Sequence, residues 1–314
     1  MTLRTLPVPD ALIGERVDAA LARMLGFSRT VAAQIADAGG VSMDNRTLSK
    51  SDRLTQGWLD VDVPDAKPVS QLRPVEVPDM GIVYEDDDVV VVDKPVGVAA
   101  HPSVGWEGPT VVEALLAGGH RVATSGASER QGIVSRLDVG TSGLMVVAKT
   151  EPAYAGLKWQ FKQRTPVKVY HALAQGHVDP LSGTIDAPIA RHPGSQWKFA
   201  VVDGGRQAVT HYQMLEMVPR ATLLEIHLET GRTHQIRVHF AALRHPLVGD
   251  LTYGADPVLA SQVGLDRQWL HATRLGFEQP VTGQWIEVES AYPPDLDQAL
   301  TVLRTPVFTS AGQG

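Results

Sequence analysis

The segment Ile133–Lys149, with the sequence IVSRLDVGTSGLMVVAK, combines a charged pair with the pattern of a buried strand. Arg136 and Asp138 stand two residues apart and are followed by the small residues 140–143. The apolar run that comes next predicts a buried strand. Asp138 is therefore expected on a loop presented by a rigid element. Catalytic residues commonly lie on such loops, because the scaffold fixes the reacting group and the loop leaves it accessible.

The composition is that of a globular protein. The chain has 314 residues, of which 43% are hydrophobic, enough to bury a full core and to form more than one domain. It contains no apolar run of about 18 residues, and its start lacks the apolar core of a secretion signal, so we expect a cytoplasmic protein without a membrane span. The absence of cysteine excludes disulfides, thiolate catalysis and cysteine-bound zinc.

A basic stretch follows Asp138. Residues 149–244 carry a net charge of +5 and seven of the eleven histidines, although the whole chain carries −7 and residues 74–148 alone also carry −7. A local positive charge of this kind fits an anionic partner such as nucleic acid. Lysines and arginines on ordinary solvated faces would explain the charge equally well.

A small domain is expected over residues 1–64. After an irregular start, residues 16–25 have helical periodicity, and a second helix opens at Ser28, a plausible N-cap. Short strands are expected near Val41 and over 58–63. This order resembles the S-four-type RNA-binding module over residues 14–64, which implies RNA contacts by Ser28 and Arg29. A small structural cap is the alternative.

A larger α+β domain is expected over residues 81–300, after a proline-rich linker at 65–80. Strands predominate and no βαβ repetition is visible, so we predict a mixed, mainly antiparallel sheet. Thr233 is expected to cap a helix that carries Arg237. We expect residues 301–314 to form a disordered tail. The other expected strands cover residues 89–92, 166–174, 208–215, 221–228 and 286–288, and the other expected helices cover 111–116 and 153–164.

Motifs for cofactors and metals are absent from the sequence. It has no glycine-rich dinucleotide fingerprint, no phosphate-binding loop ending in Gly-Lys-Ser/Thr and no His-Glu-x-x-His. His234 and His239 are five residues apart, which separates them by about 140° on a helix. We therefore expect neither a cofactor nor a metal.

Six segments occur in the order found in one family of RNA-modifying enzymes. They are SRLDVGTSGL at 135–144, KVYHAL at 168–173, IARHP at 189–193, AVTHY at 208–212, GRTHQIRVH at 231–239 and HPLVGDLTYG at 245–254. Together they resemble the RluA/RluD family of RNA pseudouridine synthases over residues 81–295. With the small module in front, the layout is similar to the RluD branch, which implies pseudouridine formation in large-subunit ribosomal RNA by a cofactor-independent, monomeric enzyme.

The resemblance also implies roles for individual residues. Asp138 would be the nucleophile, because a carboxylate can attack the ribose or the ring while the bond between them is remade. Arg136 would fill the place of the flipped base and Tyr170 would stack on it. Arg237 would pair with Asp138 and orient it. Arg232 would be the other candidate partner of Asp138, or it would contact a phosphate.

Two positions depart from the family pattern. The family usually has His where this chain has Ser135, and a basic residue is common where Val139 stands. We expect activity despite Ser135. Two other functions remain open from the residues alone: a non-catalytic RNA-binding or ribosome-assembly protein on the same fold, and a nucleoside hydrolase that uses Asp138.

Overall fold

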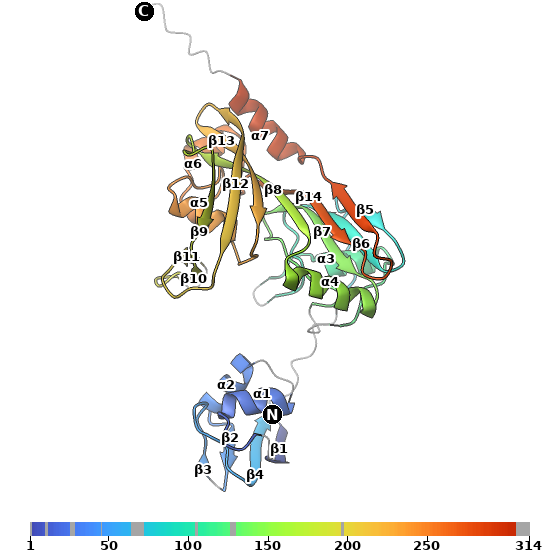
Figure 1. Ribbon diagram of the computed structural model, residues 1–314, viewed down its shortest axis with the longest axis vertical. Helices are drawn as coiled ribbons and strands as arrows, with labels where there is room; N and C mark the ends of the chain where they lie inside the picture. The colour runs from blue at the N-terminus through green and yellow to red at the C-terminus, as the bar shows by residue number, and fades with distance from the viewer. Residues whose placement is uncertain are drawn as a thin grey trace, which may run out of the picture. The chain divides into compact units, whose positions relative to one another are not determined.

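The computed structural model describes residues 2–9, 12–25, 29–44, 46–63, 72–103, 106–125, 130–195 and 198–305. The chain divides into two compact units, residues 1–71 and 72–314, each with its own core (Figure 1). Within the described ranges, none of the helices combines the length and the apolar character that a membrane crossing requires.

The first unit pairs two helices with a small sheet. The helices are α1 (Val17–Leu25) and α2 (Arg29–Asp37). The strands, in sheet order, are β1 (Thr2–Pro7), β4 (Trp58–Val63), β2 (Val41–Met43) and β3 (Arg46–Thr47). Apolar residues of both helices and of the sheet form one core, in which Leu21 and Leu59 are fully buried.

The expected irregular start is wrong, because residues 2–7 form the edge strand β1. Its backbone pairs with β4 from Thr2↔Val63 to Pro7↔Trp58. The strand buries little, and Leu3 stays 63% exposed, so no apolar alternation marks it in the sequence. The predicted N-cap Ser28 lies outside the described residues.

The second unit is built on a nine-stranded sheet. Its strands, in sheet order, are β5 (Gly81–Glu85), β6 (Val89–Lys94), β7 (Ser142–Ala148), β14 (Leu270–Glu278), β8 (Val167–Gln175), β13 (Ala221–Leu228), β12 (Val209–Val218) and β9 (Ser182–Asp186), and β15 (Trp285–Glu289) also pairs with β14. Every neighbouring pair is antiparallel except β7 and β14. The prediction of a mixed, mainly antiparallel sheet is confirmed.

Strands β6 and β7 are covered on both faces, which explains their continuous apolar sequences. One face packs against α4 (Glu151–Gln163), whose Leu157 is fully buried. The other face packs against α3 (Val111–Ala117), whose Leu115 is fully buried. All seven residues of β7 are buried, as the apolar run after Asp138 predicts.

The other half of the sheet also has helices on both faces. Helix α5 (Gln235–Ala242) packs on β8 and β13 through Ile236 and Phe240. Helices α6 (Pro257–Gln262) and α7 (Pro294–Arg304) pack on the opposite face, around the fully buried Trp269. A hairpin of β10 (Ile189–Arg191) and β11 (Phe199–Val201) lies next to α5 (Figure 1).

Two predicted boundaries need correction. Residues 72–80, expected to belong to the linker, pack on the second unit, where Val77 and Met80 contact the core beside α3. The rest of the predicted linker, 65–71, lies outside the described residues. Residues 301–304, expected in a disordered tail, complete α7, and Leu303 is buried there because the apolar residues of α7 recur at helical spacing. Residues 306–314 also lie outside the described residues.

Candidate active site

Asp138 lies on the loop that enters β7. The Thr141 N–H donates to the Asp138 carbonyl at 3.0 Å, which closes a tight turn. Gly143 then brings β7 very close to β14: its φ is 112°, and an added Cβ would stand 2.3 Å from the carbonyl oxygen of Ala272. Only glycine fits this crossing. The adjoining strand therefore fixes the carboxylate loop.

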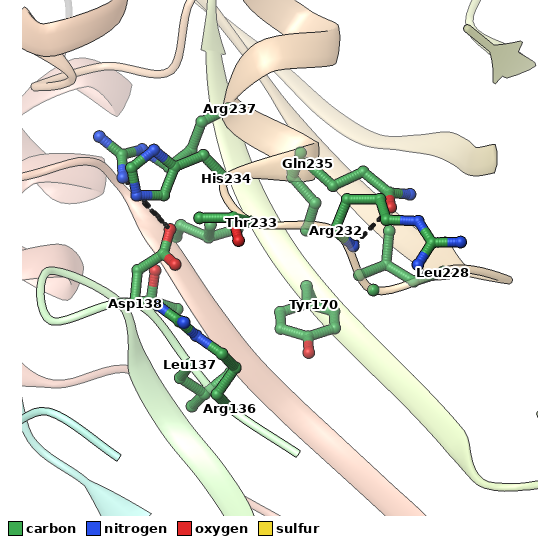
Figure 2. A pocket seen from close by; sticks show the side chains of 14 residues that line it. Arg136, Leu137, Asp138, Tyr170, Leu228, Arg232, Thr233, His234, Gln235 and Arg237 are labelled. Atoms are coloured by element: carbon green, nitrogen blue, oxygen red, sulfur yellow. Dashed lines mark hydrogen bonds and ion pairs between the residues drawn. The ribbon is translucent and has the colours of Figure 1, made fainter. Parts of the chain in front are cut away.

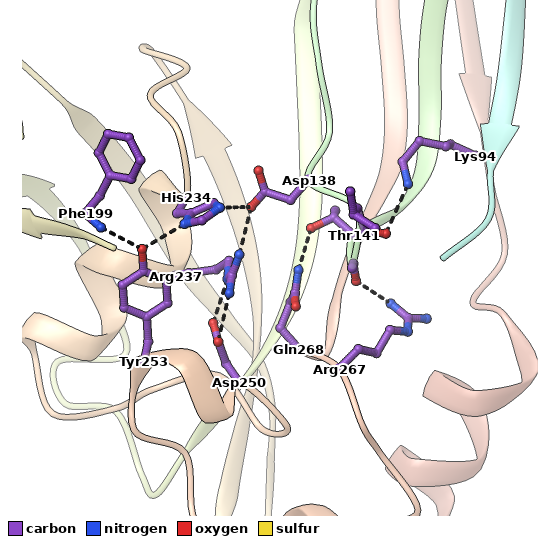
Figure 3. A network of polar contacts seen from close by, with 12 residues as sticks. Lys94, Asp138, Thr141, Phe199, His234, Arg237, Asp250, Tyr253, Arg267 and Gln268 are labelled. Atoms are coloured by element: carbon purple, nitrogen blue, oxygen red, sulfur yellow. Dashed lines mark hydrogen bonds and ion pairs between the residues drawn. The ribbon is translucent and has the colours of Figure 1, made fainter. Parts of the chain in front are cut away.

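A buried lysine supports the same loop from behind. Lys94, which is fully buried, donates from Nζ to the carbonyls of Pro95 (2.9 Å), Val98 (2.8 Å) and Val139 (3.5 Å). Figure 3 shows Lys94 on the β6 side of Asp138. Burial lowers the pKa of Lys94 to about 7, although the charge of Asp138 opposes this shift. Lys94 thus joins the 95–98 turn to the residue that follows Asp138.

Arg237, on α5, contacts two carboxylates at once. Its Nη1 donates to Asp138 Oδ2 at 3.2 Å, so the predicted pair of Arg237 and Asp138 is present. Its Nε and Nη2 donate to the two oxygens of Asp250 at 2.7 and 3.0 Å. The fork of the guanidinium is thereby held in one plane, with its remaining end directed at Asp138 (Figure 3).

The surroundings of Arg237 favour its charged form. Burial alone would lower its pKa, but the hydrogen bonds and negative charges of Asp250 and Asp138 raise that pKa above its ordinary value. The guanidinium also lies over the Tyr253 ring, 4.9 Å from its centroid. The site therefore holds a permanent positive charge beside Asp138.

His234 approaches Asp138 from the start of α5. Its Nε2 lies 3.8 Å from Asp138 Oδ2, and its Nδ1 lies 2.8 Å from the Tyr253 hydroxyl. Because the Phe199 N–H donates to that hydroxyl oxygen at 3.1 Å, the hydroxyl proton is free to point at Nδ1. This arrangement is compatible with a neutral ring that accepts at Nδ1 and carries its proton on Nε2, facing Asp138. Burial lowers the pKa of His234, which favours the neutral ring.

The predicted cap of α5 is wrong. His234, not Thr233, is the N-cap residue, in the left-handed conformation with φ 57° and without a side-chain cap bond. The Gln235 side chain ties the turn instead: its Oε1 accepts from the Arg232 N–H at 3.0 Å and from the Thr230 hydroxyl at 2.7 Å. A left-handed residue at this point aims the imidazole into the site.

Tyr170, on β8, forms an apolar wall of the site. It is half-buried, and Leu228 and Leu270 line the same pocket. Burial raises the pKa of Tyr170 to about 12, and the charge of Asp138 adds to the effect. The phenol therefore stays neutral at physiological pH.

One pocket brings together five of the residues predicted from the sequence (Figure 2): Arg136, Asp138, Tyr170, Arg232 and Arg237. The side chain of Arg136 is exposed at this pocket, whereas the Nε of Arg232 donates to the Gln207 carbonyl at 2.9 Å. Arg237, rather than Arg232, is the partner of Asp138. Arg29 belongs to the first unit, where its guanidinium pairs with Asp18 at 3.2 Å.

Four residues of the site have no role in the sequence-based prediction: Lys94, His234, Asp250 and Tyr253. Three of them stand in the family-like segments 231–239 and 245–254, which was the available signal. Their roles depend on contacts across the fold, above all the two hydrogen bonds of Asp250 to Arg237. In the part of the chain that the structure describes, no three His, Asp or Glu side chains gather as a metal site would require.

Comparison with known proteins identifies the fold and its chemistry. A family model described as RNA pseudouridylate synthase matches residues 88–242. A Mycobacterium bovis protein named "Uncharacterized RNA pseudouridine synthase" is 59% identical over 305 residues, 97% of this chain and 99% of its own. The chain belongs to the RluA/RluD family of RNA pseudouridine synthases. The protein named "Ribosomal large subunit pseudouridine synthase D" in Xanthomonas campestris is 41% identical over 96% of this chain and 93% of its own, which assigns this synthase to the RluD-like branch.

Solved structures share the fold of this chain. "Human RNA Pseudouridylate Synthase Domain Containing 1" is 29% identical to this pseudouridine synthase, with a TM-score of 0.57 over 72% of this chain and 90% of the human one. "Human RNA Pseudouridylate Synthase Domain Containing 4" shares the fold at 24% identity and a TM-score of 0.56, over 71% and 93% of the two chains. This synthase is thus an isomerase that acts on RNA.

Proposed function

We propose that this synthase converts specific uridines of large-subunit ribosomal RNA into pseudouridine, with Asp138 as the nucleophile. The names of relatives 38–42% identical support the choice of RNA. The observation that carries the mechanism is the geometry of Asp138: Arg237 holds Oδ2, and no hydrogen bond from the described residues reaches Oδ1. A carboxylate fixed at one oxygen presents the other to a substrate. With such a substrate, the enzyme would work in the cytoplasm, and we expect a monomer.

The reaction breaks the bond between ribose C1′ and uracil N1 and makes a bond between C1′ and C5. Asp138 Oδ1 would add to the ribose or to the ring, and the detached or loosened uracil would turn within the pocket. In the ribose route, closure of the new bond expels Asp138 from C1′; in the ring route, Asp138 leaves the ring afterwards by elimination. In both routes the proton lost from C5 is balanced by one gained at N1. The chain needs no external oxidant or cofactor for these steps, because substrate and product are isomers.

Two residues would hold the RNA in a reactive form. The target uridine lies within folded RNA and must leave its stack to reach Asp138. Arg136, exposed beside the pocket, would occupy the vacated space, and Tyr170 would stack on the flipped base. Arg232, at the same rim, would contact a phosphate.

The first unit would be the S-four-type RNA-binding domain. Its two helices and small sheet support this, and Arg29 is exposed at the start of α2. Asp18 holds both Arg16 and Arg29, and the hydrogen bond from Arg16 lowers the pKa of Asp18 to about 2. Such a pair orients the two guanidiniums side by side. We propose that Arg29 and Ser28 contact RNA there.

Position-resolved mapping of pseudouridine in ribosomal RNA tests the proposal. Cells that lack the gene, and cells that carry Asp138→Asn, should lose the same few pseudouridines. Asp266→Asn, which neutralises an exposed aspartate outside the pocket, should retain them. Unchanged modification in every strain would refute the choice of substrate. A phenotype rescued by Asp138→Asn would favour a ribosome-assembly role, and release of free uracil would favour a nucleoside hydrolase.

A further inference from the structure

A second pocket adjoins the active-site pocket, and most of the residues that line it have no role in the reaction described above. The two pockets share five residues: Arg136, Tyr170, Leu228, Gly231 and Arg232. The second pocket continues from them to the start of β8 and the end of α4, where Phe161, Lys162, Arg164 and Lys168 line it. A strand of RNA that enters the active site can therefore extend into this pocket without leaving the surface.

The second pocket is strongly basic. Arg136, Lys162, Arg164, Lys168 and Arg232 line it, against the single carboxylate of Glu229. That carboxylate is shared, since its Oε2 lies 3.6 Å from Arg164 Nη1 and its Oε1 lies 2.8 Å from His211 Nε2. The positive charges thus greatly exceed the negative charge available to them.

The surroundings of Lys168 indicate most clearly that the second pocket binds an anionic ligand. It is half-buried, and no carboxylate of the described residues lies within ion-pair distance of its ammonium group. Its Nζ stands 5.9 Å from the centroid of the Phe161 ring. Burial lowers the pKa of Lys168, and the charge of Arg164 lowers it further. A cation kept beside another cation, and partly out of water, is unfavourable in the free protein.

The position of Lys168 relates it to the substrate. Lys168 and Tyr170 are two residues apart on β8, so their side chains lie on the same face of the sheet at a spacing of about 7 Å. Tyr170 lines both pockets, whereas Lys168 lines only the second. A phosphate beside Lys168 would therefore lie roughly one nucleotide along the strand from a base stacked on Tyr170.

We propose that the second pocket binds the phosphodiester of a nucleotide adjacent to the target uridine, with Lys168 and Arg164 as its ligands. The inference rests on the proposed action on RNA through Tyr170 and Asp138. The bound phosphate would supply the negative charge that Lys168 lacks in the free protein. It would also fix the register of the strand, because a phosphate held next to the active site decides which base reaches Tyr170.

A neutral linkage in the RNA tests directly whether Lys168 contacts an adjacent phosphate. The substrate is the shortest ribosomal RNA segment that the wild type modifies, made in versions that each carry one methylphosphonate near the target. At one adjacent position, the neutral linkage should weaken binding by the wild type about tenfold, and binding by Lys168→Met by less than about twofold. Lys158→Met removes an equal charge from α4 outside the pocket and should keep the wild-type sensitivity.

Two further measurements separate a binding role from a structural one. Lys168→Met should not lower the melting temperature, because it removes an unpaired cation from beside Arg164. It should reduce the slope of log affinity against log salt by about 0.7–0.9, as expected for one lost phosphate contact.

The outcomes distinguish this inference from the proposed function. If the wild type modifies no segment of ribosomal RNA, the proposed function fails. If the wild type modifies the segment but Lys168→Met remains as sensitive as the wild type at every neutral linkage, the pocket does not bind an adjacent phosphate. A fall in melting temperature with an unchanged salt slope would assign Lys168 a structural role instead.

Discussion

Asp250 binds Nε and Nη2 of Arg237 through its two carboxylate oxygens, at 2.7 and 3.0 Å, and so leaves Nη1 to contact Asp138. The orientation of the nucleophile therefore depends on a residue that does not contact the substrate pocket. Asp250→Asn should lower the single-turnover rate by about 10- to 100-fold, roughly 1.4–2.7 kcal/mol. It should also destabilise the fold by about 3 kcal/mol, because Arg237 loses its buried counter-ion.

A matched variant controls for the loss of an arginine pair. Glu216 binds Arg304 through both oxygens on the surface, and neither residue lines the pocket. Glu216→Gln should leave the rate unchanged and cost less than about 1 kcal/mol of stability. Single-turnover rates and thermal unfolding of both variants test this expectation. A wild-type rate in Asp250→Asn would show that Asp138 does not need Asp250 for its orientation.

Tyr170 should act through its ring and not through its hydroxyl. Its pKa is raised to about 12, so the phenol does not titrate in the working range. Tyr170→Phe should stay within about threefold of the wild type, whereas Tyr170→Ala should lose about 1–3 kcal/mol of RNA binding or transition-state stabilisation, the size of one stacking contact. Rate profiles from pH 6 to 10 should coincide for the wild type and Tyr170→Phe. A large defect in Tyr170→Phe would assign the hydroxyl a chemical role.

Lys94 should make stability depend on pH. Its pKa falls from 10.5 to about 7 in the folded chain, so between these values the unfolded chain binds the extra proton. Stability should therefore rise with pH from about 7 to about 10, and below pH 7 both states carry the proton and the contribution is constant. The difference in unfolding free energy between the wild type and Lys94→Met, followed by urea unfolding, should show this rise. A difference that is flat across the range would contradict the expected deprotonation.

Ser135 should be tolerated in place of the histidine usual in the family. It lines the second pocket but not the pocket that contains Asp138. Ser135→His should change the single-turnover rate of pseudouridine formation by less than about a hundredfold, or 2.7 kcal/mol. A larger gain would show that the natural serine damages the site.

Gly143 should be irreplaceable. An alanine Cβ would meet the Ala272 carbonyl oxygen at 2.3 Å, and the residue would be held at a φ of 112°. Because the obstacle is the backbone of β14, Gly143→Ala should destabilise the second unit by more than about 3 kcal/mol. Gly231→Ala is the comparison, since an added Cβ there meets no atom within 4 Å. Thermal unfolding of the two variants should separate them clearly.

Local patterns were sufficient to predict the elements that carry the site. The apolar run after Asp138 is β7, and the alternating run around Tyr170 is β8. Motif order was sufficient to predict that Asp138, Tyr170 and Arg237 would be near one another, although they lie up to 99 residues apart. The catalytic roles assigned to them remain predictions.

What the sequence did not predict depends on tertiary pairing. Strand β1 buries almost nothing and exists because β4 supplies its hydrogen bonds. Asp250 lies in a family-like segment, but the segment alone does not show that its carboxylate orients the guanidinium of Arg237, a contact that forms only when the chain folds. His234 could not be recognised as a cap, since it adopts a left-handed conformation and makes no cap bond.

Strand β14 lies between the two strands that carry the site, and it follows both of them in the chain. Asp138 precedes β7, Tyr170 lies on β8, and β14 lies between these two strands. A chain made only as far as Asp250 already contains both carboxylates that contact Arg237, but it lacks the strand that pairs with β7 on one side and β8 on the other. We therefore expect a chain that ends before residue 270 to lack a stable active site, and we expect turnover on RNA only once β14 has been made.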